Sequence, residues 1–352
     1  MTTSAARALL LAPSGGHGGG IERYVQTIEW ALTAEGVEYR RCDLPGRGPA
    51  AHARLFAETR AWLAANRQPV RLIVAHRALL PVALLLARRR PGCGISLICH
   101  GIEVWGAGSR LRHMIESRLM RRPRVRVVAV SSFTAGVLAG QCRAGVLPPG
   151  LSGHWYDTLV RAASAGARTA QGVQLLTAFR LADWQDKGLA QLLEAVAVLG
   201  RPDVRVRVCG SGDPPAQLQQ LVERHPGCTL ACDLSDAELA HELAGADICV
   251  LATRTRSGRN AYGEGFGLVL LEAQVAGTAV VAPAYGGSRE AFVDGLTGVS
   301  PVDESASSLA AVLAGLLREP EFVAQMGKQA AEWARETYAP ERYARRAVAA
   351  LL

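Results

Sequence analysis

The chain has 352 residues, of which 49% are hydrophobic and 20% are charged, so it can form a large core and a soluble surface, which excludes a disordered chain. The net charge is +8, but aromatic residues make up only 5%, too few for the stacking platforms of a nucleic-acid groove. The longest strongly apolar run, 79–87, is about half the length that spans a bilayer. The N-terminus is typical of a first strand rather than of a signal peptide, so we expect a cytoplasmic protein.

Apolar strands and amphipathic helices alternate along the chain, which predicts parallel sheets covered on both faces. The predicted strands are 8–12, 72–75, 95–99 and 125–130, followed by 173–178, 204–209, 248–251 and 279–282. The predicted helices include 21–35, 188–199, 215–224 and 307–318.

This alternation breaks near Pro148-Pro149-Gly150, and a stretch rich in Ala, Gly and Ser follows. We interpret 148–172 as a linker between two Rossmann-like domains, 1–155 and 170–337. A last helix, about 338–352, is expected to return to the first domain. Because ligands of open α/β sheets bind beyond the carboxyl ends of the strands, residues that directly follow strands are the candidates for function.

Two such places lie in the first half. The run 15–20 contains Gly18, Gly19 and Gly20 between the first strand and the first helix, where backbone N–H groups can approach an anion. A flexible turn is the alternative, and the spacing departs from the dinucleotide fingerprint. His100 directly follows the strand 95–99, so it is either a ligand contact or a structural histidine.

In the second half, Arg180 and Lys187 flank a short loop after the strand 173–178, and both are suited to one diphosphate. Only Lys187 and Lys328 are lysines in a chain with 39 basic residues, which draws attention to Lys187. An exposed lysine at a helix start is the alternative.

The segment Gly263-Glu264-Gly265-Phe266-Gly267-Leu268-Val269-Leu270-Leu271-Glu272 is the most specific motif. Glu264 lies in a glycine-rich loop at a helix N-terminus, where a carboxylate can accept hydrogen bonds from ligand hydroxyls. Glu272 interrupts an apolar helical run, and a buried carboxylate requires partners, which ribose hydroxyls can supply.

These motifs together resemble glycosyltransferase family 4, whose E-x7-E signature matches EGFGLVLLE. The segment AQVAGTAVVAPAYGGSREAFVDGLTG, the loop RLADWQDKG and the first-half segments GGGIERYV, CHGIEVWG, VSSFTAGVL and LPPGL resemble further landmarks of that family. The resemblance covers nearly the whole chain. It implies the GT-B fold, an α/β fold in which two Rossmann-like domains face a central cleft, and a retaining, metal-independent transfer from a nucleotide sugar.

The resemblance also implies roles for the matching positions. Arg180 and Lys187 would neutralise the diphosphate, and His100 would lie near the reacting face of the sugar. Glu264 would hold the donor sugar together with the backbone of Phe266 and Gly267 and the helix start at Leu268. Donor binding is further implied for Gly18, Gly19, Gly20, Gly210 and Glu272, with Glu272 on the ribose.

Two departures from the family pattern stand out. The connection before EGFG is lengthened and carries Arg254, Arg256 and Arg259, which either contact phosphates or an anionic acceptor or form a solvated basic loop. The asparagine of the family's linker motif is absent from Pro148-Pro149-Gly150, so no role is assigned there.

The predicted function is therefore transfer of a sugar from a UDP-sugar, a GDP-sugar or another nucleotide sugar to an acceptor hydroxyl, with no cofactor and no metal. We expect a small soluble or natural-product acceptor. One alternative is a peripheral membrane enzyme with a phospholipid or polyprenyl-linked acceptor, because 109–126 is rich in arginine with interspersed apolar residues. Another is an inactive nucleotide-sugar-binding subunit, and a dinucleotide oxidoreductase is least favoured.

Overall fold

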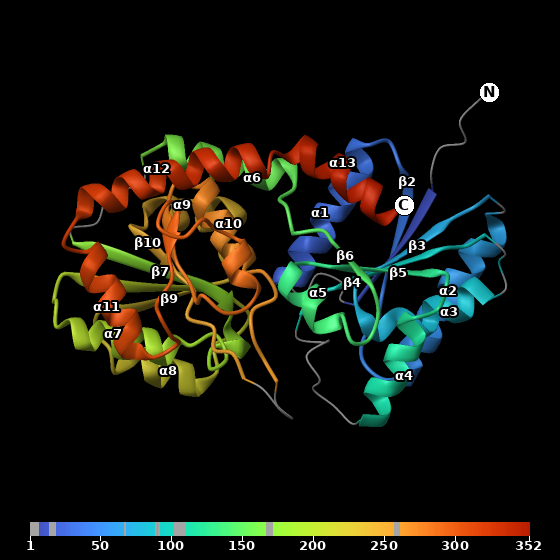
Figure 1. Cartoon of the computed structure of the whole chain (residues 1–352), viewed down its shortest axis with the longest axis horizontal. Helices are drawn as coiled ribbons and strands as arrows, with labels where there is room; N and C mark the ends of the chain where they lie inside the picture. Colours follow the sequence, from blue (N-terminus) through green and yellow to red (C-terminus); the bar gives the residue numbers. More distant parts are fainter. Residues whose placement is uncertain are drawn as a thin grey trace. The chain divides into compact units, whose positions relative to one another are not determined.

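The computed structural model describes residues 7–13, 19–66, 68–88, 90, 92–101, 110–166, 172–256 and 261–352, with the side chains of 110–113 left out. The described strands form two parallel sheets of six strands each (Figure 1). Two compact units result: the first contains the described residues up to Ser152, Ala261 and Pro340–Leu352, and the second contains Gly153–Arg256 and Tyr262–Ala339.

The first unit has a sheet in the order β2-β1-β3-β4-β5-β6. Its strands are β1 Arg7–Ala12, β2 Glu38–Asp43, β3 Arg71–Val74, β4 Ile95–Cys99, β5 Val125–Ala129 and β6 Ala144–Val146. Its helices are α1 Gly20–Ala34, α2 Pro49–Ala65, α3 Leu80–Arg88, α4 Arg110–Met120, α5 Ser132–Leu138 and α13 Pro340–Leu351.

The second unit has a sheet in the order β12-β11-β10-β7-β8-β9. Its strands are β7 Val173–Arg180, β8 Val204–Ser211, β9 Cys228–Cys232, β10 Ile248–Val250, β11 Ala279–Val281 and β12 Gly298–Val299. Its helices are α6 Gly153–Ser164, α7 Leu189–Leu199, α8 Ala216–Glu223, α9 Asp236–Gly245, α10 Leu268–Val275, α11 Ala306–Leu316 and α12 Pro320–Thr337. A core of leucine, isoleucine and valine side chains joins α7, α8 and α11 to one face of this sheet (Figure 1).

All eight strands predicted from the sequence are present, and the four that the sequence did not predict are the edge strands β2, β6, β9 and β12. Central strands are covered on both faces and show as continuous apolar runs, whereas an edge strand such as β2 (EYRRCD) alternates exposed and half-buried residues over most of its length.

The segment predicted as a linker instead contains α6, which belongs to the second unit. Trp155 and Leu159, one helical turn apart, are fully buried, and most of the remaining residues of α6 are exposed or half-buried. A helix with so narrow an apolar stripe is hard to distinguish from a polar connection in the sequence.

Helix α13 packs beside α1 in the first unit, and side chains from three strands bind its last carbonyl groups. Ser96 Oγ donates to the carbonyl of Leu351 at 2.7 Å, Arg71 Nε donates to the same oxygen at 3.2 Å, and Arg126 donates to the carbonyl of Ala350 at 3.1 Å. Two of the three donors are cations, which the negative end of the helix dipole favours.

The ring of Tyr343 in α13 lies directly against Gly150, where an added Cβ would come within 2.4 Å of two ring carbons. Gly150→Ala should therefore force the ring away and destabilise the first unit by about 1–3 kcal/mol, as overpacking does in other cores. Urea unfolding measures the change. Gly140→Ala is the matched control, because nothing lies within 4 Å of a Cβ there. Equal stability of the two variants would contradict the contact.

Candidate functional site

An ion pair joins two loops at the carboxyl ends of β7 and β10 in the second unit. Lys187, in the loop after β7, donates through Nζ to Oε2 of Glu264 at 2.8 Å. The hydroxyl of Thr253, in the loop after β10, donates to the same oxygen at 3.1 Å. This edge is where ligands of open α/β sheets bind.

The ion pair is largely withdrawn from solvent, with 18% of the Lys187 side chain and 14% of the Glu264 side chain exposed. Burial by itself lowers the pKa of Lys187, but the adjacent Glu264 carboxylate, with smaller effects from Tyr262 and Asp183, raises it above its ordinary value. Lys187 is therefore a permanent cation at neutral pH.

Close backbone packing fixes the lysine loop against the end of β10. Gly188 has φ +70°, and a Cβ there would lie 1.9 Å from the carbonyl oxygen of Ala252, so only glycine fits. The amide of Arg254 donates to the carbonyl of Asp186 at 3.2 Å. Together these contacts keep Lys187 beside Thr253.

Part of the segment before Glu264 contacts this loop, although the side chains of Arg254 and Arg256 are exposed. Arg256 forms an ion pair with Asp186, and its guanidinium lies 5.6 Å from the centre of the Tyr262 ring. Arg256 and Tyr262 form an antiparallel bridge, and Glu304 accepts a hydrogen bond from the amide of Thr255. Arg259 lies outside the described residues.

Arg180, the last residue of β7, is 55% exposed. Its Nε and Nη2 both donate to Oδ2 of Asp183, at 2.9 and 2.8 Å. Arg180 and Lys187 thus have separate carboxylate partners, although Asp183 is close enough to Lys187 to raise its pKa.

The loop that carries Glu264 leads into α10. Gly267 precedes the helix with φ +82°, and Leu268 is the first helical residue. Phe266 is buried, and its ring meets that of Tyr338 edge to face with centres 6.3 Å apart. The N-terminal N–H groups of α10 are therefore held near Glu264 by a glycine turn that other residues rarely adopt.

Glu272, expected to be a buried carboxylate that needs partners, is 5% exposed. Its Oε1 accepts a hydrogen bond from the indole Nε1 of Trp155 at 2.9 Å. Helix α6 thus supplies a partner for this carboxylate that the sequence did not predict; the sequence had suggested that ribose hydroxyls would serve. Contact with a ribose stays a prediction.

Gly210, expected to lie against the nucleotide, has a packing role of its own. A Cβ at this position would lie 2.3 Å from Leu181 Cδ2 and 2.5 Å from the carbonyl oxygen of Phe179. Glycine is needed there because β8 runs close to the end of β7, whether or not a ligand is bound.

The remaining predicted residues lie in the first unit. A ring nitrogen of His100, Nε2, is 2.8 Å from the carbonyl oxygen of Ala75, and Tyr24 packs edge-on against the imidazole with ring centres 5.3 Å apart. Gly19 precedes α1 with φ +85°, Gly20 is its first residue, and nothing lies within 4 Å of a Cβ at either. Gly18 lies outside the described residues.

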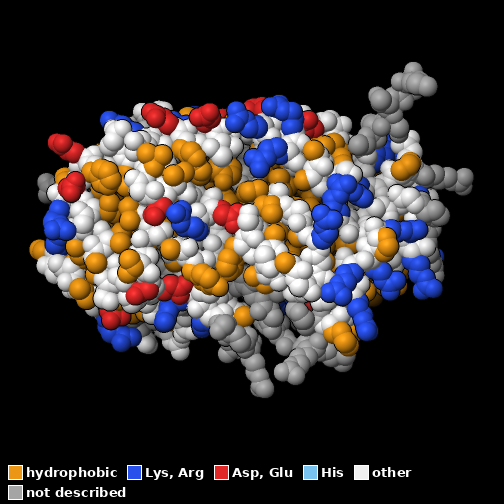
Figure 2. All heavy atoms as spheres, viewed as in Figure 1, with side chains coloured by type: hydrophobic (Ala, Val, Ile, Leu, Met, Phe, Trp, Pro, Cys, Tyr) orange, Lys and Arg blue, Asp and Glu red, His pale blue; other side chains and the backbone are white. Residues whose placement is uncertain are grey.

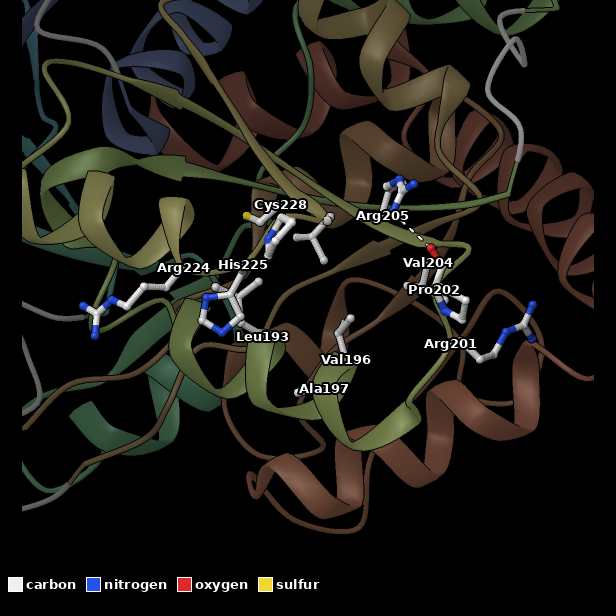
Figure 3. Close-up of a pocket in the computed structure, with 13 residues that line it drawn as sticks. Leu193, Val196, Ala197, Arg201, Pro202, Val204, Arg205, Arg224, His225 and Cys228 are labelled. Atoms are coloured by element: carbon white, nitrogen blue, oxygen red, sulfur yellow. Dashed lines mark hydrogen bonds between the residues drawn. The ribbon is translucent and has the colours of Figure 1, made fainter.

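A separate cavity of about 220 Å³ lies at the opposite, N-terminal ends of β8 and β9 (Figure 3). Leu193 and Val196 from α7 contribute to its apolar lining, and Arg205 and Arg224 add charge. None of the residues predicted to be functional lines this cavity. Among the described residues, no three His, Cys, Asp or Glu side chains group closely enough to hold a metal ion.

Sequence reasoning missed several members of the site, namely Trp155, Asp183, Asp186, Thr253 and Tyr262. The two aspartates gave a usable signal, because acidic residues beside Arg180 and Lys187 are natural ion-pair partners. The other three carry no comparable mark in the sequence.

Most of the second unit is similar in sequence to known glycosyltransferases. Residues 174–333, most of the second unit, match the model of the family Glycosyl transferases group 1. A D-inositol 3-phosphate glycosyltransferase of Arthrobacter is 34% identical over 41% of this chain, and a phosphatidyl-myo-inositol mannosyltransferase of Mycolicibacterium smegmatis is 34% identical over 42%. The matched parts span only 35% and 36% of those relatives' own lengths.

The fold extends over the whole chain. Sucrose-phosphate synthase of Thermosynechococcus elongatus superposes with a TM-score of 0.80 at 19% identity, covering 97% of both chains. Anabaena HepE in complex with UDP-glucose superposes with a TM-score of 0.75 at 16% identity, covering 98% of this chain and 100% of the other. The chain therefore has the two-domain α/β architecture of GT-B proteins.

The hydrogen bond between Trp155 and Glu272 is testable through stability. Trp155→Phe keeps an aromatic ring but removes the indole N–H, so the buried carboxylate loses a donor at a cost of about 1–3 kcal/mol. Urea unfolding of Trp155→Phe, Glu272→Gln and the double variant measures the coupling between the two side chains. Strictly additive effects would show that the bond contributes nothing.

Proposed function

We propose that the protein is a retaining glycosyltransferase of family 4, which transfers a sugar from a nucleotide-diphosphate sugar to an acceptor hydroxyl. The Lys187–Glu264 ion pair carries the proposal. It combines a cation and a carboxylate at the carboxyl edge of the sheet, beside the N-terminus of α10, inside the segment that matches the glycosyltransferase family model. The complex of HepE with UDP-glucose supports a nucleotide sugar as donor.

The atoms around the ion pair are suited to both parts of such a donor. An ammonium group has three N–H donors, so Lys187 can contact a phosphate oxygen while it still binds Glu264. Among the described residues Oε2 of Glu264 accepts both hydrogen bonds, which leaves Oε1 for a sugar hydroxyl. We assign Arg180 to the same diphosphate. When the donor binds, the diphosphate would take the place of Asp183 as the partner of Arg180.

In the proposed reaction the bond between the anomeric carbon and the diphosphate oxygen breaks, and the acceptor oxygen bonds to that carbon on the same face. The acceptor proton passes to the departing phosphate oxygen. Lys187 and Arg180 offset the negative charge that develops on the leaving group, a role that needs no metal ion in this proposal.

The central prediction is that Lys187 binds the donor through its charge. Lys187→Met should weaken binding of a UDP- or GDP-sugar and lower kcat/KM by roughly tenfold to hundredfold, since it removes a charge-assisted hydrogen bond. Thermal shifts with a panel of nucleotide sugars identify the donor, and product formation measures turnover.

Lys328→Met is the matched control, because it removes the chain's other lysine from an exposed position in α12. If Lys187→Met kept wild-type affinity and turnover, the diphosphate assignment would be wrong. Binding without any product would favour the inactive-subunit alternative. Inversion of the anomeric configuration, read by NMR of the product, would contradict the retaining mechanism.

A second candidate is a membrane-surface acceptor, in place of the small soluble acceptor that the sequence favoured. The relative from Mycolicibacterium smegmatis is a phosphatidyl-myo-inositol mannosyltransferase by name. On α4, Met114 and Ile115 are 44% and 47% exposed, with exposed Arg118 and Arg122 close by in sequence. Figure 2 shows basic side chains beside hydrophobic ones over this part of the first unit. In the described ranges, no helix combines the length and the apolar character required to cross a membrane.

Flotation with anionic vesicles tests this candidate. The wild type should co-float with phosphatidylglycerol vesicles at low salt and less at high salt, because each basic side chain at the surface contributes about 1 kcal/mol that salt screens. Ile115→Glu should abolish flotation, whereas Val302→Glu, at a 92% exposed apolar position of the second unit, should not. A wild type that stays with the soluble fraction would leave the soluble acceptor as the better candidate.

A further inference from the structure

The phenol of Tyr262 is buried in the centre of the candidate site without a partner. Tyr262 is 8% exposed, and its hydroxyl has no hydrogen-bond partner among the described residues. Buried hydroxyl groups nearly always have a partner, and leaving one unpaired is costly. A buried, unpaired hydroxyl at the candidate site is therefore a group that a ligand can satisfy.

The surroundings of Tyr262 place it in the donor-binding cluster. Lys187, Glu264, Asp183 and Asp186 all interact with its hydroxyl electrostatically. Burial raises the pKa of Tyr262 to about 12, with Lys187 acting in the opposite direction. The phenol is consequently neutral at physiological pH and serves as a hydrogen-bond donor and acceptor rather than as a base.

The lengthened segment before Glu264 holds this ring in place. Tyr262 forms a backbone bridge with Arg256, and the Arg256 guanidinium covers the ring while it pairs with Asp186. This is the departure from the family pattern for which the sequence left open contact with phosphates, contact with an anionic acceptor, or a solvated basic loop. Arg256 forms an ion pair with Asp186, and Tyr262, among the described residues of this segment, has a buried hydroxyl without a hydrogen-bond partner.

We propose that the Tyr262 hydroxyl hydrogen-bonds a hydroxyl of the transferred sugar and so helps to select the donor. This inference rests on the proposed function. Three carboxylates, from Asp183, Asp186 and Glu264, act on the phenol. They outnumber the two cations beside it, Lys187 and Arg256, and would repel a further anion there, so the sugar is a better match than the diphosphate. A neutral polyol meets no such repulsion and has both donors and acceptors.

Tyr262→Phe tests the proposal because it removes only the unpaired oxygen. Affinity for the nucleotide sugar identified with the wild type should fall about threefold to tenfold, the usual effect of one hydrogen bond. Affinity for the corresponding free nucleotide diphosphate should be unchanged. The melting temperature without ligand should stay the same or rise, since a buried unsatisfied hydroxyl is lost. Tyr39→Phe, on β2 of the first unit, is the control.

Three results would overturn the proposal. Wild-type affinity of Tyr262→Phe for the nucleotide sugar would show that the hydroxyl does not contact the sugar. An equal loss of affinity for the free nucleotide diphosphate would move the contact to that part of the donor. A fall of several degrees in melting temperature without ligand would indicate a structural hydroxyl. Failure of the wild type itself to bind any nucleotide sugar is a distinct result, because it removes the proposed function as well.

Discussion

The salt bridge between Lys187 and Glu264 is the interaction on which the rest of the candidate site depends. It joins the loop after β7 to the loop that starts α10, two segments separated by 77 positions in the sequence. A buried pair of this kind is stable only if both charges remain paired, since removal of either partner leaves an uncompensated charge. The surrounding contacts, Gly188 against Ala252 and Thr253 on the same carboxylate oxygen, therefore hold a geometry that is costly to distort.

The central strands were predictable from the sequence because burial on both faces leaves a continuous apolar run. The edge strands were not, since β2 and β9 mix exposed and buried side chains, and β6 and β12 are only three and two residues long. Helix α6 was missed for a related reason, because Trp155 and Leu159 carry most of its burial among polar and small residues. Hydrophobic patterns in the sequence therefore reveal deeply buried elements and miss elements that are mostly exposed.

In the site, the sequence identified the residues that belong to a motif and missed those that support them. Lys187 and Glu264 were found because each lies at a recognisable loop next to a helix start. Trp155 and its partner Glu272 are 117 positions apart, and no local pattern joins them. Tyr262 was also not predicted, because its importance lies in a buried hydroxyl that has no hydrogen-bond partner among the described residues, which only the three-dimensional packing reveals.

The docking of α13 has a consequence for how the chain folds. The first unit is synthesised before the second, yet α1 acquires its neighbour α13, and Gly150 its contact with Tyr343, only after residues 340–351 have been made. The unit that emerges first from the ribosome is thus completed last, after the whole second unit is available to fold as one continuous segment. During that interval the α13-binding face of α1, with Tyr24 near the position of Tyr343, lacks its cover.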